Sequence, residues 1–320
     1  MSNTYHDWEK IGLIFDPTSL GLPWMKSHAQ NPLPEHLGGG VFKVYFATRD
    51  SLNRSRGGFF VFDIERPFDR LEHSEEPFID LGPLGAFDDS GVMPSSLVDY
   101  QGCRYLYSTG WSRTVDVVFA FHIGLFLSQD GGKTYYRPSL APVLGRNRHD
   151  PYVTGAPFVL IEDGLFRMWY VSGTSWLKET VAAKPKHFYT VKYAESDDGL
   201  SWVTSSDLCL EYQANEYAIA RPVVRKSRDG HYEMWITFRG GTQTNRVGMA
   251  SSPDGRSWTR CPNPVGLDVS RSGWDSEMIC YAYPFEYDGV LYALYNGNSY
   301  GATGIGLAVR TTDTNGRPSI

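Results

Sequence analysis

Ser128-Gln-Asp-Gly-Gly-Lys-Thr-Tyr135 is the first of three related segments in this chain of 320 residues. The others are Ser196-Asp-Asp-Gly-Leu-Ser-Trp202 and Ser252-Pro-Asp-Gly-Arg-Ser-Trp258. Asp-Gly supplies the positive backbone angles of a tight hairpin turn, and the aromatic residue after it is large enough to pack between neighbouring sheets. The copies lie about sixty residues apart, a period expected of a propeller blade and too long for a helical solenoid.

A second pattern occurs five times and predicts five blades. It is a buried β run with an aromatic residue near its end, usually followed by Gly, and its copies are residues 41–47, 104–111, 166–173, 232–240 and 291–297. A shorter segment with Pro precedes each copy, namely Gln30-Asn-Pro32, Val92-Met-Pro94, Gly155-Ala-Pro157, Ala220-Arg-Pro222 and Ala282-Tyr-Pro284. The first strand of each propeller blade lines the central channel, so we expect these five segments to face one another.

The two ends of the chain complement each other. Residues 304–310 match the predicted third strands at 191–195 and 247–251, and no proper fourth strand follows them. Residues 7–17 have the pattern of a missing fourth strand, with Trp8 in the place of the later repeat tryptophans. We therefore predict an all-β, five-bladed β-propeller over residues 1–320, a single domain whose ring is closed by the N-terminal strand in the last blade.

Composition narrows the class of protein. An aromatic content of 14%, with 33 glycines and 19 prolines, suits many short strands, and a net charge of −6 argues against nucleic acid as a partner. Neither an apolar run long enough for a membrane span nor a secretory signal is visible. The four cysteines form no Cys-x-x-Cys pair and are expected in the core: Cys103, Cys209, Cys261 and Cys280. We expect a cytoplasmic protein with no cofactor, no metal motif and an oligomeric state that the sequence does not reveal.

Candidate catalytic carboxylates fall at the predicted channel mouth. Arg148-His-Asp-Pro151 resembles the Arg-Asp-Pro element of five-bladed glycoside hydrolases such as invertases, levansucrases, arabinanases and xylosidases. Glu277, followed by Met278-Ile-Cys280, resembles the general-acid Glu of a later blade in those families. The resemblance implies cleavage of a glycosidic bond in a small glycoside, with Glu277 as general acid and Asp150 as the positioning and pKa-tuning carboxylate. The alternative for Asp150 is a turn cap before Pro151.

The first blade departs from this pattern. The related families place a nucleophilic or basic Asp just before a Pro, whereas this chain has Gln30-Asn31-Pro32. An amide cannot act as a base at neutral pH. Either a carboxylate of the adjoining blade replaces the Asp, with Asp89 as the reserve base, or the reaction is not simple hydrolysis. A turn before Gly91 explains Asp88 and Asp89 equally well.

Basic and aromatic residues also gather in the channel-mouth segments. The basic ones are Lys26, His28, Arg148, His149, Arg221, Arg239 and Arg271. Clustered Arg and His suit a phosphate or a carboxylated sugar, and in this respect the chain resembles the mannoside phosphorylases. Pairing of each Arg with a neighbouring acid, such as Arg148 with Asp150, is the alternative. Trp111 and Trp274 are candidates for stacking on a sugar, whereas Trp169, Trp202, Trp235 and Trp258 lie at repeat positions and are expected in the core.

Three functions remain open on the sequence. The first is a glycoside hydrolase, the second a glycoside phosphorylase or glycosyl-transferring enzyme with an Arg/His anion site, and the third a non-catalytic sugar-binding propeller. The partner in each is a small carbohydrate, with phosphate added in the second. The predicted binding residues are His28, Gln30, Asn31, Trp111, Arg148, His149, Glu216, Arg221, Arg271 and Trp274.

Overall fold

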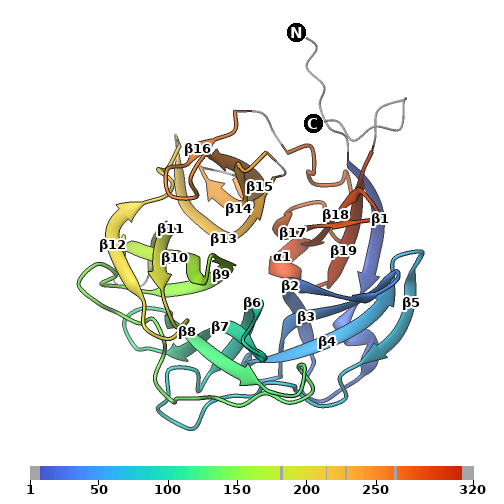
Figure 1. The fold of residues 1–320 in the computed structure, drawn as a ribbon, viewed down its shortest axis with the longest axis horizontal. Coiled ribbons are helices and arrows are strands. Elements are labelled where there is room, and N and C mark those ends of the chain that lie inside the picture. The colour runs from blue at the N-terminus through green and yellow to red at the C-terminus, as the bar shows by residue number, and fades with distance from the viewer. Residues whose placement is uncertain are drawn as a thin grey trace.

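The strands of the protein are arranged around a centre (Figure 1). The computed structural model describes residues 8–180, 183–213, 215–227, 229–241, 243–262 and 265–311. Within them the strands form three hydrogen-bonded sheets. The first holds β2 (Ser27–Gly38), β3 (Val41–Arg49), β4 (Ser55–Asp63), β5 (Arg66–His73), β6 (Gly91–Tyr100), β7 (Cys103–Arg113) and β8 (Phe119–Ser128).

The second sheet is the largest. It holds β9 (Thr154–Glu162), β10 (Leu165–Leu177), β11 (Lys186–Ser196), β12 (Val203–Leu208), β13 (Glu216–Lys226), β14 (Tyr232–Gly240), β15 (Gln243–Ser252) and β16 (Thr259–Arg260). The third holds β17 (Cys280–Tyr287), β18 (Val290–Asn296), β19 (Ile305–Arg310) and β1 (Trp8–Phe15). A 3-10 helix (Pro17–Leu20) follows β1, and the short helix α1 (Asn298–Gly301) follows β18.

Each of the two larger sheets consists of two antiparallel runs. A single parallel pair joins the runs, Ser55 with Gly91 in the first sheet and Tyr189 with Ala218 in the second. The innermost strands contact one another in cyclic order, β2, β6, β9, β13, β17 and back to β2 (Figure 1). The five Pro-containing segments predicted to face one another lie on these strands. The prediction of an all-β propeller-type architecture is therefore confirmed.

The N-terminal strand pairs with the last strand of the chain. β1 runs antiparallel to β19, from Trp8 opposite Arg310 to Phe15 opposite Ile305. Trp8 packs edge-on against Trp235 at a centroid distance of 5.5 Å, and its indole N–H donates to the Val265 carbonyl at 3.2 Å. The predicted pairing of the two ends is confirmed, although the hydrogen-bonded ladder is divided among three sheets and does not run continuously around the ring.

The repeated Asp-Gly turns have the predicted left-handed glycines and an additional internal cap. Gly199 and Gly255 have φ of 72° and 75°. In the last copy the Ser252 hydroxyl accepts from the Gly255 amide at 2.8 Å, and Asp254 accepts from the amides of Arg256 and Ser257, both at 2.8 Å. Side chains at the start of the motif therefore satisfy the backbone of the turn, as in other Asx turns.

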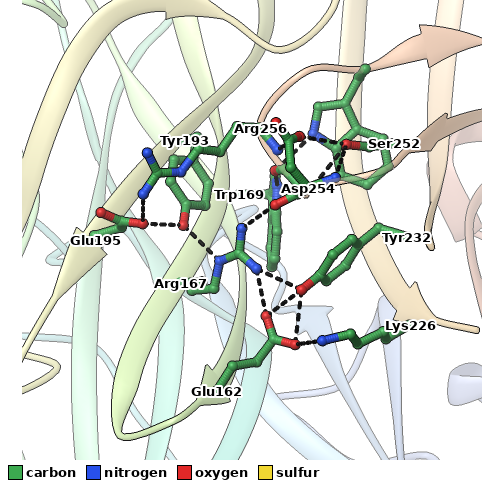
Figure 2. Close-up of polar contacts among 12 residues, drawn as sticks. Glu162, Arg167, Trp169, Tyr193, Glu195, Lys226, Tyr232, Ser252, Asp254 and Arg256 are labelled. Carbon is green, nitrogen blue, oxygen red and sulfur yellow. Dashed lines mark hydrogen bonds and ion pairs between the residues drawn. The ribbon is translucent and has the colours of Figure 1, made fainter. Parts of the chain in front are cut away.

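These turns also attach neighbouring strand groups to each other. The carbonyl of Gly199 accepts from the Tyr107 hydroxyl at 2.8 Å, and that of Gly255 accepts from the Trp169 indole at 2.7 Å. Beside the second contact lies the buried Arg167, which donates to Glu162, Tyr193, Tyr232 and the Asp254 carbonyl (Figure 2). The network ties β10 to the β15–β16 turn.

The repeat tryptophans occupy the core as predicted. Trp169 and Trp235 are buried, and Trp202 and Trp258 are half-buried against the clusters around them. All four cysteines are free; Cys209 and Cys280 are buried, whereas Cys103 and Cys261 are half-buried. None of the helices in the described residues is long and apolar enough to cross a membrane.

A β-bulge interrupts each innermost strand near the centre of the ring. The register shifts between Gln30 and Leu33 in β2, and equivalent shifts occur in β6, β9, β13 and β17. Asn31, Ala156, Arg221 and Tyr281 lie at four of these bulges with φ between 43° and 58°. Bulges re-aim side chains and concentrate near functional sites. Here they direct residues toward the central channel.

Candidate functional site

A cavity of about 310 Å³ occupies the centre of the ring. Its wall is built from the innermost strands together with the facing ends of β3, β7, β8, β10, β11 and β14, and from Tyr300 of α1. The cavity lies on the side of the ring where the chain passes from the second to the third strand of each group. Because every strand group contributes, the cavity is the point where residues distant in sequence meet.

Three arginines line this cavity, and none of them forms an ion pair within the described residues. Arg221 donates to the backbone carbonyls of Ser95 (2.8 Å) and Pro32 (3.4 Å). Arg49 donates to the side-chain oxygens of Gln30 (3.1 Å) and Asn53 (2.9 Å). All these acceptors are neutral, so the two guanidinium charges are not compensated by a carboxylate.

Arg239 is the third cavity arginine and also has neutral partners. It donates to the Tyr300 hydroxyl at 2.8 Å and to Nε2 of His187 at 3.2 Å. Burial, together with the charge of Arg239, lowers the pKa of His187 to about 4, so the ring is a neutral acceptor at neutral pH. The Nε atoms of Arg221 and Arg239 are buried without a hydrogen-bond partner in the described residues.

Arg221 is a buried cation whose pKa is lowered by desolvation. Its side chain is only 1% exposed, and desolvation lowers its pKa to about 10. A buried charge without a counter-ion is unfavourable unless another group compensates it. An anion in the cavity would provide that compensation and would accept the free Nε–H of Arg221.

Part of the wall next to the arginines is aromatic and apolar. Phe119 and Phe121 of β8 stack at 3.9 Å with an interplanar angle of 9°, and Phe119 meets His187 edge-on at 5.1 Å. Trp176 extends this wall outward, 5.5 Å from Phe119. Such rings can pack against the C–H face of a sugar.

The polar part of the wall is formed by cationic and neutral groups. Among the described residues that line it, none is Asp or Glu. The polar residues beside the arginines are Gln30, Asn31 and Thr109, with the phenols of Tyr189, Tyr281 and Tyr300. The cavity therefore presents arginines and neutral hydrogen-bonding groups to a ligand, with an aromatic surface on one side. The described residues also contain no group of three or more His, Cys, Asp or Glu placed to hold a metal ion.

Asp150 lies outside the cavity wall, fully buried. It accepts from the Ser172 hydroxyl (2.7 Å), the Tyr170 hydroxyl (3.0 Å) and the Asn147 amide (2.9 Å), and it lies 3.3 Å from Nζ of Lys192. These contacts hold the 147–150 turn onto β10 and β11. They support the turn-capping alternative, and a catalytic role for Asp150 stays a prediction.

The other candidate carboxylates also lie outside the cavity wall. Asp89 accepts from the Gly85 amide (3.1 Å) and the Ser90 hydroxyl (2.8 Å), as a turn residue does. Glu216 forms an ion pair of 3.1 Å with Arg260. Glu277 is exposed, and its backbone amide donates to the Asn298 side chain at 2.8 Å, next to the helix that carries Tyr300. Of these carboxylates, Glu277 is exposed and contacts the helix whose Tyr300 lines the cavity.

Of the predicted binding residues, Gln30, Asn31 and Arg221 line the cavity and the others do not. His28 is half-buried beside Ser27, and burial, with the charge of Arg49, lowers its pKa to about 4. Arg148 and Arg271 are exposed, and Arg148 donates to His149 at 2.8 Å. Trp111 donates to Ser55, and Trp274 stacks on Tyr295. Both tryptophans thus have intramolecular partners.

The structure adds residues that the sequence analysis did not select. Arg49, His187, Tyr281, Phe119 and Phe121 all line the cavity. The sequence held a signal for two of them. Arg49 is the last residue of a second strand, and Arg239, which the sequence analysis did select, is the last but one residue of another. Tyr281 directly precedes the Pro-containing first-strand segment Ala282-Tyr-Pro284. The aromatic pair on β8 had no distinguishing pattern.

Comparison with known proteins places the chain in a family. No family model matches it. The Mycobacterium tuberculosis protein named uncharacterized protein Rv1502 (strain ATCC 25618 / H37Rv) is 36% identical over 303 residues, which are 94% of this chain and 98% of that protein. The chain belongs to the Rv1502 family. The uncharacterized protein MT1551 of strain CDC 1551 / Oshkosh matches over the same lengths with the same identity.

Solved structures similar to this Rv1502-family chain are propeller-type carbohydrate enzymes. A glycoside hydrolase has a TM-score of 0.75 at 16% identity and covers 99% of this chain and 94% of its own. A structure described as belonging to the GH130 family of mannoside phosphorylases, which contains hydrolases of β-1,2 mannosidic linkages, has a TM-score of 0.69 at 12% identity, covering 100% and 98%. The predicted resemblance to the propeller glycosidase superfamily is confirmed at the level of the fold.

Proposed function

We propose that this Rv1502-family protein is a carbohydrate-active enzyme that transfers a glycosyl group between a small glycoside and inorganic phosphate. The observation that carries the proposal is the central cavity, in which three arginines lack a carboxylate partner and no Asp or Glu lines the wall within the described residues. A buried cationic cavity of this kind suits a phosphate or phosphorylated ligand.

The missing first-blade Asp is consistent with phosphorolysis. Hydrolysis of a glycoside requires a carboxylate to activate water or to attack the sugar, in addition to a proton donor. A phosphate oxygen is already nucleophilic and needs no base. Gln30 and Asn31, which stand where related hydrolases have the Asp, leave the charge of Arg49 available to the phosphate.

The aromatic wall supports a sugar as the second ligand. Phe119 and Phe121 present apolar surface next to the arginines, so a glycosyl ring can pack there while its anionic partner faces the guanidinium groups. The similar structures named above include hydrolases and phosphorylases, and at 12–16% identity they support the fold and not a substrate.

Hydrolysis is the second candidate, because Glu277 is exposed and its amide bonds to Asn298 of the helix that carries Tyr300. In that case Glu277 is the general acid, with Asp150 as a positioning carboxylate and Asp89 as reserve base. A non-catalytic sugar-binding propeller is the third, favoured by the structural contacts of Asp150 and Glu216.

As part of the proposal we count the strand groups as five blades of one domain over residues 1–320, in a cytoplasmic protein.

The test measures glycosyl transfer in both directions. The protein is incubated with a panel of hexose and pentose 1-phosphates plus monosaccharide acceptors, and released phosphate is measured; in parallel it receives 4-nitrophenyl and alkyl glycosides with and without phosphate. Turnover that requires phosphate and is lost in Arg239→Gln supports the proposal. Turnover that is independent of phosphate favours hydrolysis, and sugar binding without turnover favours the binding module.

A further inference from the structure

Among the described residues that line the cavity are three phenols and no carboxylate. Tyr189, Tyr281 and Tyr300 line it, together with His187. Since His187 accepts a hydrogen bond from Arg239 through Nε2, and Tyr300 accepts one from the same guanidinium, both are engaged in positioning that arginine. Because no carboxylate of the described residues lines the cavity, we look among its phenols for the group that protonates the leaving oxygen of a glycoside.

Tyr281 is the phenol that all three cavity arginines share. Arg49, Arg221 and Arg239 each interact electrostatically with it. The arginines come from β3, β13 and β14, whereas Tyr281 lies on β17, so four separate strands converge on this phenol. These three arginines line the same cavity as Tyr281, so positive charge faces the phenolate that forms when Tyr281 gives up its proton.

The backbone fixes Tyr281 in this place. The residue has a left-handed φ of 55° and lies in the bulge of β17 between Cys280 and Tyr283. Its amide donates to the Thr237 hydroxyl of β14 at 2.7 Å. A non-glycine residue in this conformation is strained by about 1–3 kcal/mol, and such strain concentrates at functional sites.

The phenol of Tyr281 is held in its protonated form. Desolvation raises its pKa well above the ordinary value, and the nearby charge of Arg239 opposes that effect. Among the described residues, none makes a hydrogen bond with the Tyr281 hydroxyl, so its proton is free for a ligand. Tyr189 also lines the cavity, but among the arginines it interacts with Arg239.

We propose that Tyr281 is the general acid of this site, a phenol in the same cavity as Arg49, Arg221 and Arg239 that takes the place of the carboxylic acid used by the glycoside hydrolases that the sequence resembles. As the bond between the anomeric carbon and the glycosidic oxygen breaks, its electron pair stays on that oxygen, which receives the proton from Tyr281 Oη. A phosphate oxygen forms the new bond to the anomeric carbon. The products are a sugar 1-phosphate and an alcohol, and the phenolate regains, through water, the proton that the hydrogen phosphate ion loses when it becomes the sugar 1-phosphate.

This inference rests on the proposed function, but the leaving group tests it separately. A general acid matters for an alkoxide, which is a strong base, and matters little for 4-nitrophenolate, which leaves without a proton. In Tyr281→Phe we expect kcat on an alkyl glycoside to fall about 100-fold or more, whereas kcat on the 4-nitrophenyl glycoside changes less than about tenfold. Affinity for inorganic phosphate should change far less than kcat.

Tyr283→Phe is the matched control, because Tyr283 is a neighbouring β17 phenol that interacts with Arg221 and does not line the cavity. We expect it to retain both activities. An equal loss on both leaving groups in Tyr281→Phe, or no loss on either, overturns the acid role. If turnover does not depend on phosphate, but Tyr281→Phe still loses much more activity on the alkyl glycoside than on the 4-nitrophenyl glycoside, phosphorolysis alone is overturned. If the protein turns over none of the glycosides, both proposals are overturned.

Discussion

Gln30 accepts a hydrogen bond of 3.1 Å from Nε of Arg49 at the edge of the central cavity. Gln30 is buried, and it directly precedes Asn31 and Pro32, where the sequence resemblance to five-bladed glycoside hydrolases leads one to expect an Asp before the Pro. Because the acceptor is an amide, Arg49 is fixed in position without losing its net charge. The strands β2 and β3 thus hold a cation, and no carboxylate, at this edge of the cavity within the described residues.

Gln30→Glu should convert this site from an anion acceptor to an internal ion pair. The new carboxylate would lie within hydrogen-bond distance of Arg49 and would compete with a phosphate ligand for its guanidinium. We expect the affinity for inorganic phosphate, measured by isothermal titration calorimetry, to fall about tenfold or more, or about 1.4 kcal/mol.

Gln30→Leu is the control for Gln30→Glu, since it removes the acceptor and adds no charge. It should weaken phosphate binding less than the acidic variant does. Equal affinity in the wild type and in Gln30→Glu is the result that contradicts an anion site at Arg49.

Arg221 should make phosphate binding decline in alkaline solution. Burial lowers its pKa to about 10, and a bound anion favours the charged form. Binding energy from this residue is therefore present below that pH and lost as the pH rises through about 10. We expect the phosphate affinity of the wild type to fall across this range.

Arg221→Met should bind phosphate at least tenfold more weakly at neutral pH and should lose the contribution that titrates near pH 10. Removing an unpaired buried charge also relieves its desolvation, so the melting temperature should not fall by more than a few degrees. A large loss of melting temperature with unchanged phosphate affinity would instead assign Arg221 to the scaffold, through its bonds to Ser95 and Pro32.

Local sequence patterns predicted the scaffold because each depends on a few adjacent residues. The Asp-Gly turns, the strand containing Trp8 and the core tryptophans follow from turn chemistry and strand periodicity. The site was harder to predict, because its residues come from many strands and four of them, Asn31, Ala156, Arg221 and Tyr281, lie at bulges of the innermost strands. Asp150 matched a short motif, yet its environment is a buried turn that no local pattern reveals. Arg221 was found because it occupies a Pro-containing first-strand segment.

Glu162 should make the protein less stable in acid. Burial alone would raise its pKa, but hydrogen bonds from Lys226, Tyr232 and Arg167 outweigh that effect and lower the pKa to about 2 (Figure 2). Its ordinary value is 4.5. A carboxylate whose pKa is lower in the folded state stabilises the fold above its ordinary value, and that contribution is lost as the pH falls from 4.5 toward 2.

In Glu162→Gln we expect the melting temperature to depend less on pH in acid than it does in the wild type. The melting temperature of this variant should be lower than that of the wild type at neutral pH, and the difference should shrink as the pH falls below 4.5. The exposed Glu65 provides the control variant Glu65→Gln, which should follow the wild type throughout. Parallel curves for the wild type and Glu162→Gln would show that this network does not titrate with folding.

Gly255→Ala should test how tightly the repeated turn is docked. Gly255 has φ of 75°, and a Cβ there would lie 2.8 Å from Nη2 of Arg167 and 3.1 Å from the Trp169 ring. Gly230→Ala is a matched control, because Gly230 has φ of 89° and nothing within 4 Å of the position of a Cβ. The control should lose about 1 kcal/mol of unfolding free energy in urea from backbone strain alone. Gly255→Ala should lose a further 1–3 kcal/mol, roughly, because Arg167 and Trp169 must move. Equal losses in the two variants would mean that the turn adjusts without disturbing the Trp169 contact, and the inter-blade docking would then contribute little to stability.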